Sequence, residues 1–318
     1  MTKKEFTYLM FGNKDAIINK IKGAFYGCAV GDALGMPVEF QNKSERDRIG
    51  LVTQMLHGGT LNGHDNFKDL PAGTWTDDTS MMLCLAYSLI ENGFNYNDQL
   101  KKYYEWLYNG YLSCCEKSIG SGGATRDALK NFKDNGTIFN GNETTLGNGS
   151  LMRILPIPLY FIDSPVECAY FASESAKTTH NNNICKNFTM LYALAIRDAF
   201  LCVDKECITP ERYSFMNVCN EVLSDTITVE ELYEKSASGN IVYSYYLAME
   251  CFEKANDFKT GMIMAINKLG DSDTYGAIYG SLAGAYFGFD SIPKQWIHCL
   301  QGKDMIEDIC NKYIDLLV

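Results

Sequence analysis

The chain of 318 residues is 46% hydrophobic and 21% charged, which is typical of a folded globular protein and excludes an intrinsically disordered chain. Its formal net charge of −11 excludes broad electrostatic binding to nucleic acid. Its longest uncharged stretches are shorter than the ~20 apolar residues of a membrane helix, so we expect neither nucleic acid nor a membrane among its partners.

Helices are predicted along most of the chain, because apolar residues recur with the 3.6-residue helical period. In chain order, the predicted helices cover residues 15–33, 79–92, 98–108, 165–177, 183–202, 229–236, 242–255 and 273–287. Polar, glycine-containing loops are predicted over 57–71 and 133–147. No flexible linker divides the chain. We therefore expect residues 1–318 to form a single all-α domain, a bundle of a dozen or more helices.

Glycine recurs at every fourth position in two of these helices. The positions are Gly23, Gly27, Gly31 and Gly35 in the first helix, and Gly276, Gly280, Gly284 and Gly288 in the second. An interior glycine costs a helix about 0.5–1 kcal/mol relative to alanine, and a spacing of four places all of them on one face. We expect these faces to pack closely against other backbone. Acidic residues lie beside both helices: Asp32 and Glu39 near the first, and Asp271 and Asp273 near the second.

Two acidic clusters precede predicted helices, Thr76–Asp77–Asp78–Thr79 and Asp271–Ser272–Asp273–Thr274. Asp and Thr are good helix N-caps, but one cap per helix is enough. Four carboxylates brought together would repel one another unless a cation neutralised them, and oxygen ligands suit Mg²⁺, Mn²⁺ or Ca²⁺ better than Zn²⁺. From the residues alone, two helix caps and a metal site are both possible.

A glycine-containing turn, Gly147–Asn148–Gly149–Ser150, precedes another apolar segment. Its backbone N–H groups are suited to an anion such as a pyrophosphate, although an ordinary capped turn has the same composition. Arg153 follows the turn and is suited either to a phosphate or to a buried structural ion pair.

Six motifs resemble those of the ADP-ribosylglycohydrolase family and occur in the family's order, from about residue 22 to residue 296. They read GAFYGCAVGDALGMPVEF, GTWTDDTSM, GSGGATRDAL, GNGSLMRILPIP, the pair Thr179–His180, and GDSDTYGAIYGSLAGAYFG leading to IPKQW. The resemblance implies an all-α orthogonal bundle whose site holds two Mg²⁺ ions, with Mn²⁺ as the alternative.

The resemblance also implies the roles of individual residues. The implied metal ligands are Thr76, Asp77, Asp78, Asp271, Asp273 and Thr274. Glu39 is implied to approach the metal centre and, with the metal-bound Asp78, to position or deprotonate the attacking water. The implied substrate-binding residues are Gly122, Gly147, Asn148, Gly149, Ser150, Met152 and His180. A lone histidine such as His180 is otherwise commonly structural.

The implied reaction is metal-dependent hydrolysis of the glycosidic bond between ADP-ribose and a modified acceptor. The acceptor is protein arginine, protein serine or a small ADP-ribose ester, and the sequence does not distinguish among them. Two alternatives remain: a non-catalytic ADP-ribose-binding or crystallin-like relative, and a metal-dependent hydrolase of phosphate esters. Glu39 favours the enzyme, since binding alone would not require that carboxylate.

The chain has the features of a cytoplasmic protein, which we expect to be a monomer. Its N-terminal segment lacks the apolar run and cleavage site of a signal peptide. Its twelve cysteines include no C-x-x-C pair. Cys28, Cys84, Cys168 and Cys185 lie in apolar runs and are predicted to be small buried hydrophobic residues, although the even count would permit disulfides in a secreted protein.

Overall fold

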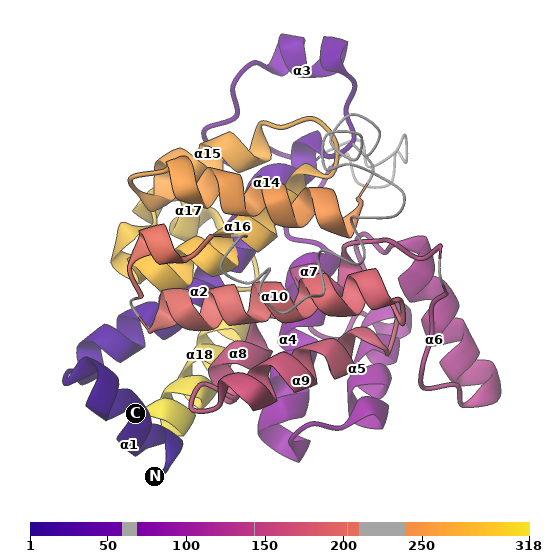
Figure 1. Cartoon of the computed structure of the whole chain (residues 1–318). Coiled ribbons are helices and arrows are strands. Elements are labelled where there is room, and N and C mark those ends of the chain that lie inside the picture. Colours follow the sequence, from indigo (N-terminus) through magenta and orange to yellow (C-terminus); the bar gives the residue numbers. More distant parts are fainter. Residues whose placement is uncertain (59–68, 143, 202, 210–238) are drawn as a thin grey trace, which may run out of the picture.

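The computed structural model describes residues 1–58, 69–142, 144–201, 203–209 and 239–318 (Figure 1). Its α-helices are α1 (Lys3–Phe11), α2 (Lys14–Gly35), α3 (Lys43–Ile49), α4 (Asp77–Asn92), α5 (Tyr96–Asn109), α6 (Gly123–Asn135), α7 (Gly149–Met152), α8 (Pro156–Tyr160), α9 (Pro165–Ala176), α10 (Asn183–Phe200), α14 (Ile241–Lys254), α15 (Phe258–Ile266), α16 (Ser272–Phe287), α17 (Lys294–Cys299) and α18 (Lys303–Leu317). Short 3₁₀ turns are η1 (Met36–Val38), η3 (Lys205–Cys207) and η4 (Phe289–Ser291). The described residues contain no strand, only an isolated bridge between Gly147 and Asn240. The predicted all-α class is confirmed.

Every predicted helix within the described residues is present, with its ends within two residues of the predicted ones. The prediction for 229–236 lies outside the described residues, as does most of the predicted loop 57–71. The ranges predicted from periodicity do not include the short helices α7, α8 and α17, and they also omit α1, α3, α6, α15 and α18. The predicted loop 133–147 is wrong at its start, because its first three residues form the last turn of α6. That helix buries only Thr125, Ala128 and Leu129, so its apolar face is too narrow to stand out in the sequence.

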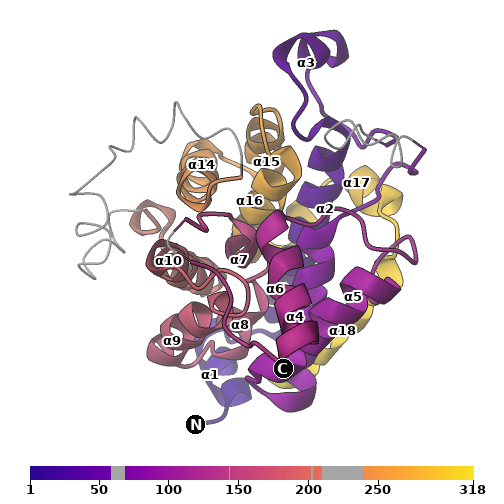
Figure 2. The same cartoon turned by 90° about the vertical axis from the view of Figure 1, so that its right-hand side faces the viewer.

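Helices α2 and α16 lie side by side in the middle of the molecule (Figures 1 and 2). They run antiparallel, and their glycines meet in register. A Cβ atom added to Gly27 would lie 2.2 Å from the carbonyl oxygen of Gly280, and one added to Gly31 would lie 1.9 Å from that of Gly276. The missing side chains therefore allow backbone to contact backbone, as the four-residue spacing predicts.

The two ends of this helix pair differ from a simple glycine repeat. Gly288 ends α16 with a φ of +81°. Its carbonyl carbon would lie 2.6 Å from a Cβ atom on Gly23, but a Cβ atom on Gly288 itself would meet the side chain of Asn19 instead of the α2 backbone. At the other end, Gly35 lies against the first turn of α16, and an added Cβ atom would be 2.4 Å from the Cα atom of Asp273. The glycine contact thus places the end of α2 directly against the start of α16.

Other helices surround this pair and form one continuous apolar core with it. Helices α4, α10, α14, α15 and α18 pack against α2, α16 or both. The core contains all three tryptophans, Trp75, Trp106 and Trp296. The chain ends meet where the hydroxyl of Thr7 on α1 donates to the carbonyl of Leu317 on α18.

The structure describes the four cysteines that the sequence predicts to be buried. Cys28, Cys84, Cys168 and Cys185 are fully buried, and none of the described cysteines forms a disulfide. Among the described residues, no helix combines the length and the apolar character needed to cross a membrane.

Because the two helices touch through their backbones, adding one methyl group at a contact glycine should destabilise the protein strongly. Gly27→Ala should lower the free energy of unfolding by about 2 kcal/mol or more, because the new Cβ atom overlaps the backbone of Gly280. Chemical denaturation would measure the change. Gly123→Ala is the control, since no atom lies within 4 Å of its new Cβ atom; it should leave stability unchanged or slightly raised. Equal stability of the two variants would contradict the contact.

Candidate metal centre and active site

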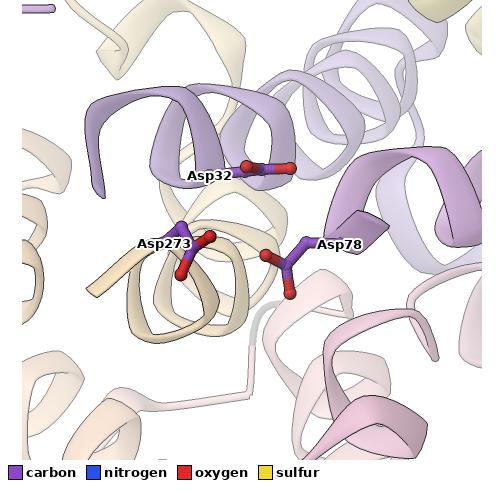
Figure 3. A group of neighbouring side chains, drawn as sticks. All are labelled: Asp32, Asp78 and Asp273. Atoms are coloured by element: carbon purple, nitrogen blue, oxygen red, sulfur yellow. The ribbon is translucent and has the colours of Figure 1, made fainter. Parts of the chain in front are cut away.

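Three helices each bring a carboxylate to one point. Asp32 lies near the end of α2, Asp78 in the first turn of α4 and Asp273 in the first turn of α16, and the three side chains point toward one another (Figure 3). A carboxylate oxygen from each lies within 4.8 Å of the other two. All three side chains are buried. The end of α2 and the start of α16 meet because of the glycine contact, and α4 completes the group.

A second carboxylate group shares a member with the first. Oxygen atoms of Glu39, Asp271 and Asp273 lie within 4.8 Å of one another. Glu39 follows η1 and is the partly exposed member of this group. The backbone holds it there, because the N–H of Phe40 donates to the carbonyl of Gly270 at 2.7 Å. The two adjacent groups share Asp273, and each offers oxygen ligands suited to a divalent cation.

Helix capping accounts for Asp32 but not for Asp77, Asp78 or Asp271. Neither Asp77 nor Asp78 caps α4, and Asp271 makes no side-chain capping bond to α16. The cap of α4 comes instead from another helix: Asp32 accepts bonds from the backbone N–H groups of Thr76 and Thr79, each at 3.0 Å. It also lies 3.0 Å and 2.6 Å from their hydroxyl oxygens. Asp273 accepts from the backbone N–H of Thr274 in its own first turn at 2.8 Å.

The two threonines predicted as ligands border Asp78. The hydroxyl oxygen of Thr76 is 3.1 Å from Oδ2 of Asp78, and that of Thr274 is 3.1 Å from Oδ1. The predicted ligands Thr76, Asp78, Asp271, Asp273 and Thr274 are therefore brought together, and Glu39 lies beside them.

Asp77 has a different position from the other predicted ligands. It belongs to neither carboxylate group, is partly exposed, and faces the glycine turn before α6. A Cβ atom on Gly120, whose φ is +70°, would lie 2.3 Å from Oδ1 of Asp77, so only glycine fits there. The predicted Gly122 is exposed at the N-cap of α6, with open space around its Cα atom.

Burial and mutual repulsion raise the pKa values of these carboxyl groups. Burial is the main cause for each, and neighbouring carboxylates contribute to the increases at Glu39, Asp78 and Asp273. The pKa of Asp32 rises to about 6 and that of Asp77 to about 7. In the part of the chain that the structure describes, no lysine or arginine forms an ion pair with this cluster. Buried, unpaired oxygen ligands fit one or more hard divalent cations.

The turn predicted to bind substrate contacts the acidic cluster through Asn148. Its side-chain amide donates to Oδ2 of Asp271 at 2.8 Å and to the hydroxyl of Ser244 at 2.9 Å. Asn148 thus orients a candidate ligand, a role that the sequence did not indicate. The side chains of Ser150 and Met152 are buried behind the turn, where the Ser150 hydroxyl bonds that of Thr189 at 2.8 Å.

His180 lies against the two glycines of this turn. Added Cβ atoms on Gly147 and Gly149 would be 3.0 Å from Nε2 and 2.7 Å from Cε1 of the imidazole, respectively. The ring is buried, and its Nδ1 is 2.7 Å from the hydroxyl oxygen of Thr179. Burial, with the positive charge of Arg153, lowers the pKa of His180 to about 3. The imidazole is therefore neutral at physiological pH.

Arg153 is fully buried and does not form the ion pair that was one of its two predicted roles. Its guanidinium donates to Gly149, Thr178 and Thr179, and stands 5.0 Å from the ring centre of Tyr103. No carboxylate among the described residues pairs with it. The guanidinium lies next to the glycine turn, where its partners are a backbone carbonyl, two threonine hydroxyls and a tyrosine ring.

Asp32 is the member of the cluster that the sequence did not identify as a site residue. The available signal was its position: it is the only charged residue between Gly23 and Gly35, a stretch of α2 that is buried throughout. A charge inside such a helix requires a specific partner. The partner, the first turn of α4, is 44 residues away in sequence and could not be identified from the pattern.

Comparisons with known proteins give a consistent result. A profile of the ADP-ribosylglycohydrolase family matches residues 13–317. The ADP-ribosylarginine hydrolase Tri1 of Pseudomonas putida is 29% identical, covering 94% of this chain and 78% of that protein. The ADP-ribosyl-(dinitrogen reductase) glycohydrolase of Rhodospirillum rubrum is 29% identical, covering 95% and 97%. ADP-ribosylhydrolase ARH3 of Homo sapiens is 24% identical, covering 90% of each. A solved structure named ADP-ribosylglycohydrolase-related protein complex has a TM-score of 0.76 and 32% identity, covering 96% of this chain and 100% of that one.

The raised pKa values predict how metal ions and pH act together on stability. Without a cation, the folded state holds protons that the unfolded state has lost, so the free energy of unfolding falls as pH rises from about 4 toward 7. A cation that binds the ionised cluster restores this loss. Thermal unfolding at pH 8 should therefore show a larger increase in Tm on adding Mn²⁺ or Mg²⁺ than unfolding at pH 5.5. At a concentration of 100 Kd the gain is about 2.7 kcal/mol.

Two variants test whether Mn²⁺ stabilises the protein by binding to the carboxylate cluster or through a general effect of charge. Asp273→Asn removes the carboxylate common to both groups and should abolish the stabilisation by Mn²⁺ at pH 8. Asp134→Asn makes the same change in charge at an exposed site on α6 and should retain it. A stabilisation that persists in Asp273→Asn would show that the ions bind elsewhere.

Proposed function

Because this chain belongs to the ADP-ribosylglycohydrolase family, whose members hydrolyse glycosidic bonds, we propose that it is a metal-dependent hydrolase that releases ADP-ribose from a modified acceptor. One observation carries the proposal. Two buried carboxylate groups share Asp273, and Glu39 stands at their partly exposed edge. A helix-capping role leaves this arrangement unexplained, whereas hydrolysis by an activated water requires both parts of it.

The chain offers oxygen ligands for two divalent cations. Mg²⁺, or Mn²⁺ as the alternative, would be held by Thr76, Asp77, Asp78, Asp271, Asp273 and Thr274, and when bound would lower the pKa of a water molecule and orient ribose hydroxyls. Asn148 and Asp32 keep this arrangement rigid, the first by bonding Asp271 and the second by bonding the first turn of α4.

Glu39 and Asp78 have separate tasks in the proposed reaction. Cleavage at the anomeric carbon of the ribose builds oxocarbenium character and needs a deprotonated water. Glu39 is the partly exposed carboxylate of the two groups, and the raised pKa of its carboxyl favours acceptance of the proton. Asp78 is buried between the hydroxyls of Thr76 and Thr274 and positions the water. Glu39 would have no such task in a protein that only bound ADP-ribose.

The substrate would lie between the acidic cluster and the glycine turn. Gly122 has open space where a side chain would be, whereas the imidazole of His180 lies against Gly147 and Gly149 and offers a polar edge at the turn. Asn148 joins the turn to Asp271, so that substrate binding and metal binding share one element. The candidate ligands of one chain suffice for the proposed site, and we expect the enzyme to be a monomer.

Among the possible acceptors, we propose ADP-ribosylated arginine on a protein first. Two relatives that are 29% and 28% identical are named ADP-ribosylarginine hydrolase, and ARH3 of Homo sapiens is 24% identical. Serine-linked ADP-ribose and a small ADP-ribose ester remain the alternatives.

The reaction can be tested by measuring free ADP-ribose. Arginine-linked, serine-linked and ester-linked ADP-ribose should be incubated with the protein in Mg²⁺, in Mn²⁺ and in EDTA. We expect release from the arginine linkage with either metal and none with EDTA. Failure to cleave any of the three linkages under every metal condition would refute the proposed function.

Glu39 and Asp273 should fail in different ways. Glu39→Gln removes the proposed base, and should lower kcat by about 10²-fold or more while Mn²⁺ still raises Tm. Asp273→Asn should lose both activity and the effect of Mn²⁺ on Tm, because it removes the carboxylate common to both groups. Wild-type turnover by Glu39→Gln would eliminate Glu39 as the base.

A further inference from the structure

A buried chain of hydrogen bonds leads from Arg153 to His180. Nη2 of Arg153 lies 2.7 Å from Oγ1 of Thr179, and the same oxygen lies 2.7 Å from Nδ1 of His180. All three side chains are buried, so water does not compete for these contacts. The chain lies outside the acidic cluster: His180 contacts Gly147 and Gly149 of the turn, whereas Asn148 between them bonds Asp271.

The donors and acceptors in this hydrogen-bond chain favour one arrangement of protons. A guanidinium can only donate, so the oxygen of Thr179 accepts from Arg153. The hydroxyl then has its own proton to donate, and Nδ1 of His180 is the acceptor recorded for it among the described residues. If Nδ1 carried the proton, two donors would face one oxygen and the hydroxyl proton would lose this partner, at a cost in a buried site. Nδ1 therefore accepts, and the ring proton of the neutral imidazole is on Nε2.

Burial and the positive charge of Arg153 keep the imidazole of His180 neutral. The guanidinium has no carboxylate partner among the described residues, and a second positive charge on His180 would be repelled in this buried setting. The lowered pKa of His180, about 3, has burial and Arg153 as its causes. The hydroxyl of Thr179 can orient the imidazole of His180, but burial and the positive charge of Arg153 are what disfavour a second proton on the ring.

The proton on Nε2 faces the predicted substrate turn. Nε2 would be 3.0 Å from a Cβ atom on Gly147 and 3.2 Å from one on Gly149, so the imidazole lies directly against the two glycines, in the space that their side chains would fill. We propose that Arg153 and Thr179 are positioning residues that hold His180 as the neutral Nε2–H tautomer, so that it donates a hydrogen bond to an oxygen of ADP-ribose at the Gly147–Gly149 turn. The ligand in this statement rests on the proposed function, whereas the tautomer does not.

The tautomer can be observed directly by NMR of protein labelled with ¹⁵N-histidine. Two-bond correlations distinguish a protonated ring nitrogen from an unprotonated one, and the chain has only four histidines to assign. His180→Gln identifies the signals of His180. We expect an unprotonated Nδ1 and a protonated Nε2 at pH 7. A protonated Nδ1, in a neutral or a charged ring, would overturn the proposal.

Three variants test whether Thr179 sets the tautomer. Thr179→Val removes the hydroxyl and keeps the shape, and should make the two tautomers of His180 mix. Thr179→Ser keeps the hydroxyl and should retain the wild-type pattern. Thr178→Val is the matched control: it also removes a bond from Arg153, at 3.2 Å, but that hydroxyl donates to Ser175 and does not contact His180. It should also retain the pattern. An unchanged tautomer in Thr179→Val would overturn the proposal.

Kinetics then test the contact with substrate. In Thr179→Val the KM for the ADP-ribosylated substrate should rise about tenfold, the equivalent of one lost hydrogen bond, while kcat changes much less. Thr179→Ser and Thr178→Val should have the KM of the wild type. An unchanged KM in Thr179→Val would refute the donor role of His180. If no variant and no wild-type protein released ADP-ribose, the proposed function would fail, and the NMR result would still decide the tautomer.

Discussion

The backbone contact between α2 and α16 is the constraint on which the site depends. Helices that pack through ordinary side chains stay about 8–10 Å apart, whereas here Gly27 and Gly31 face the carbonyls of Gly280 and Gly276 directly. The same contact continues to the end of α2, where Gly35 lies against Asp273. Asp32 is one helical turn earlier on α2. The glycine contact along the whole helix therefore brings the carboxylates of Asp32 and Asp273 to the same place.

This arrangement works against stability. The carboxyl groups are buried among one another and their pKa values are raised, so the folded state without a cation carries a cost that increases with pH. Neutral donors offset part of it: the first turn of α4 bonds Asp32, and Asn148 bonds Asp271. Sites that trade stability for function in this way are common in enzymes.

The two sides of the candidate site differ in charge. The carboxylates gather where α2, α4 and α16 meet, and the only nearby cation described, Arg153, is buried behind the glycine turn. Asn148 belongs to that turn and also bonds Asp271, so it connects the two sides. In the proposed function, the ribose would meet the metal ions on the acidic side, and His180 would donate to an oxygen of the same ligand from the other.

The longer helices of the core were predictable because each carries a broad apolar face. Helices α4, α9 and α10 begin and end within two residues of their predicted limits. Helix α6 was missed, since it buries three residues and is otherwise polar. Asp77, Asp78, Asp271 and Asp273 were recognised as candidates because two acidic clusters before two helices exceed the need for caps.

The sequence by itself determined the all-α class, the two glycine faces and the identity of the acidic clusters, because helical period and residue type are local properties of the chain. It left open whether Asp77 and Asp78 are caps or ligands. Tertiary structure decided that the cap of α4 is Asp32, that Asn148 bonds Asp271, and that Arg153 acts on His180 through Thr179. These hydrogen bonds join elements that are far apart in the sequence. The local sequence pattern does not determine which distant donor will lie next to which acceptor.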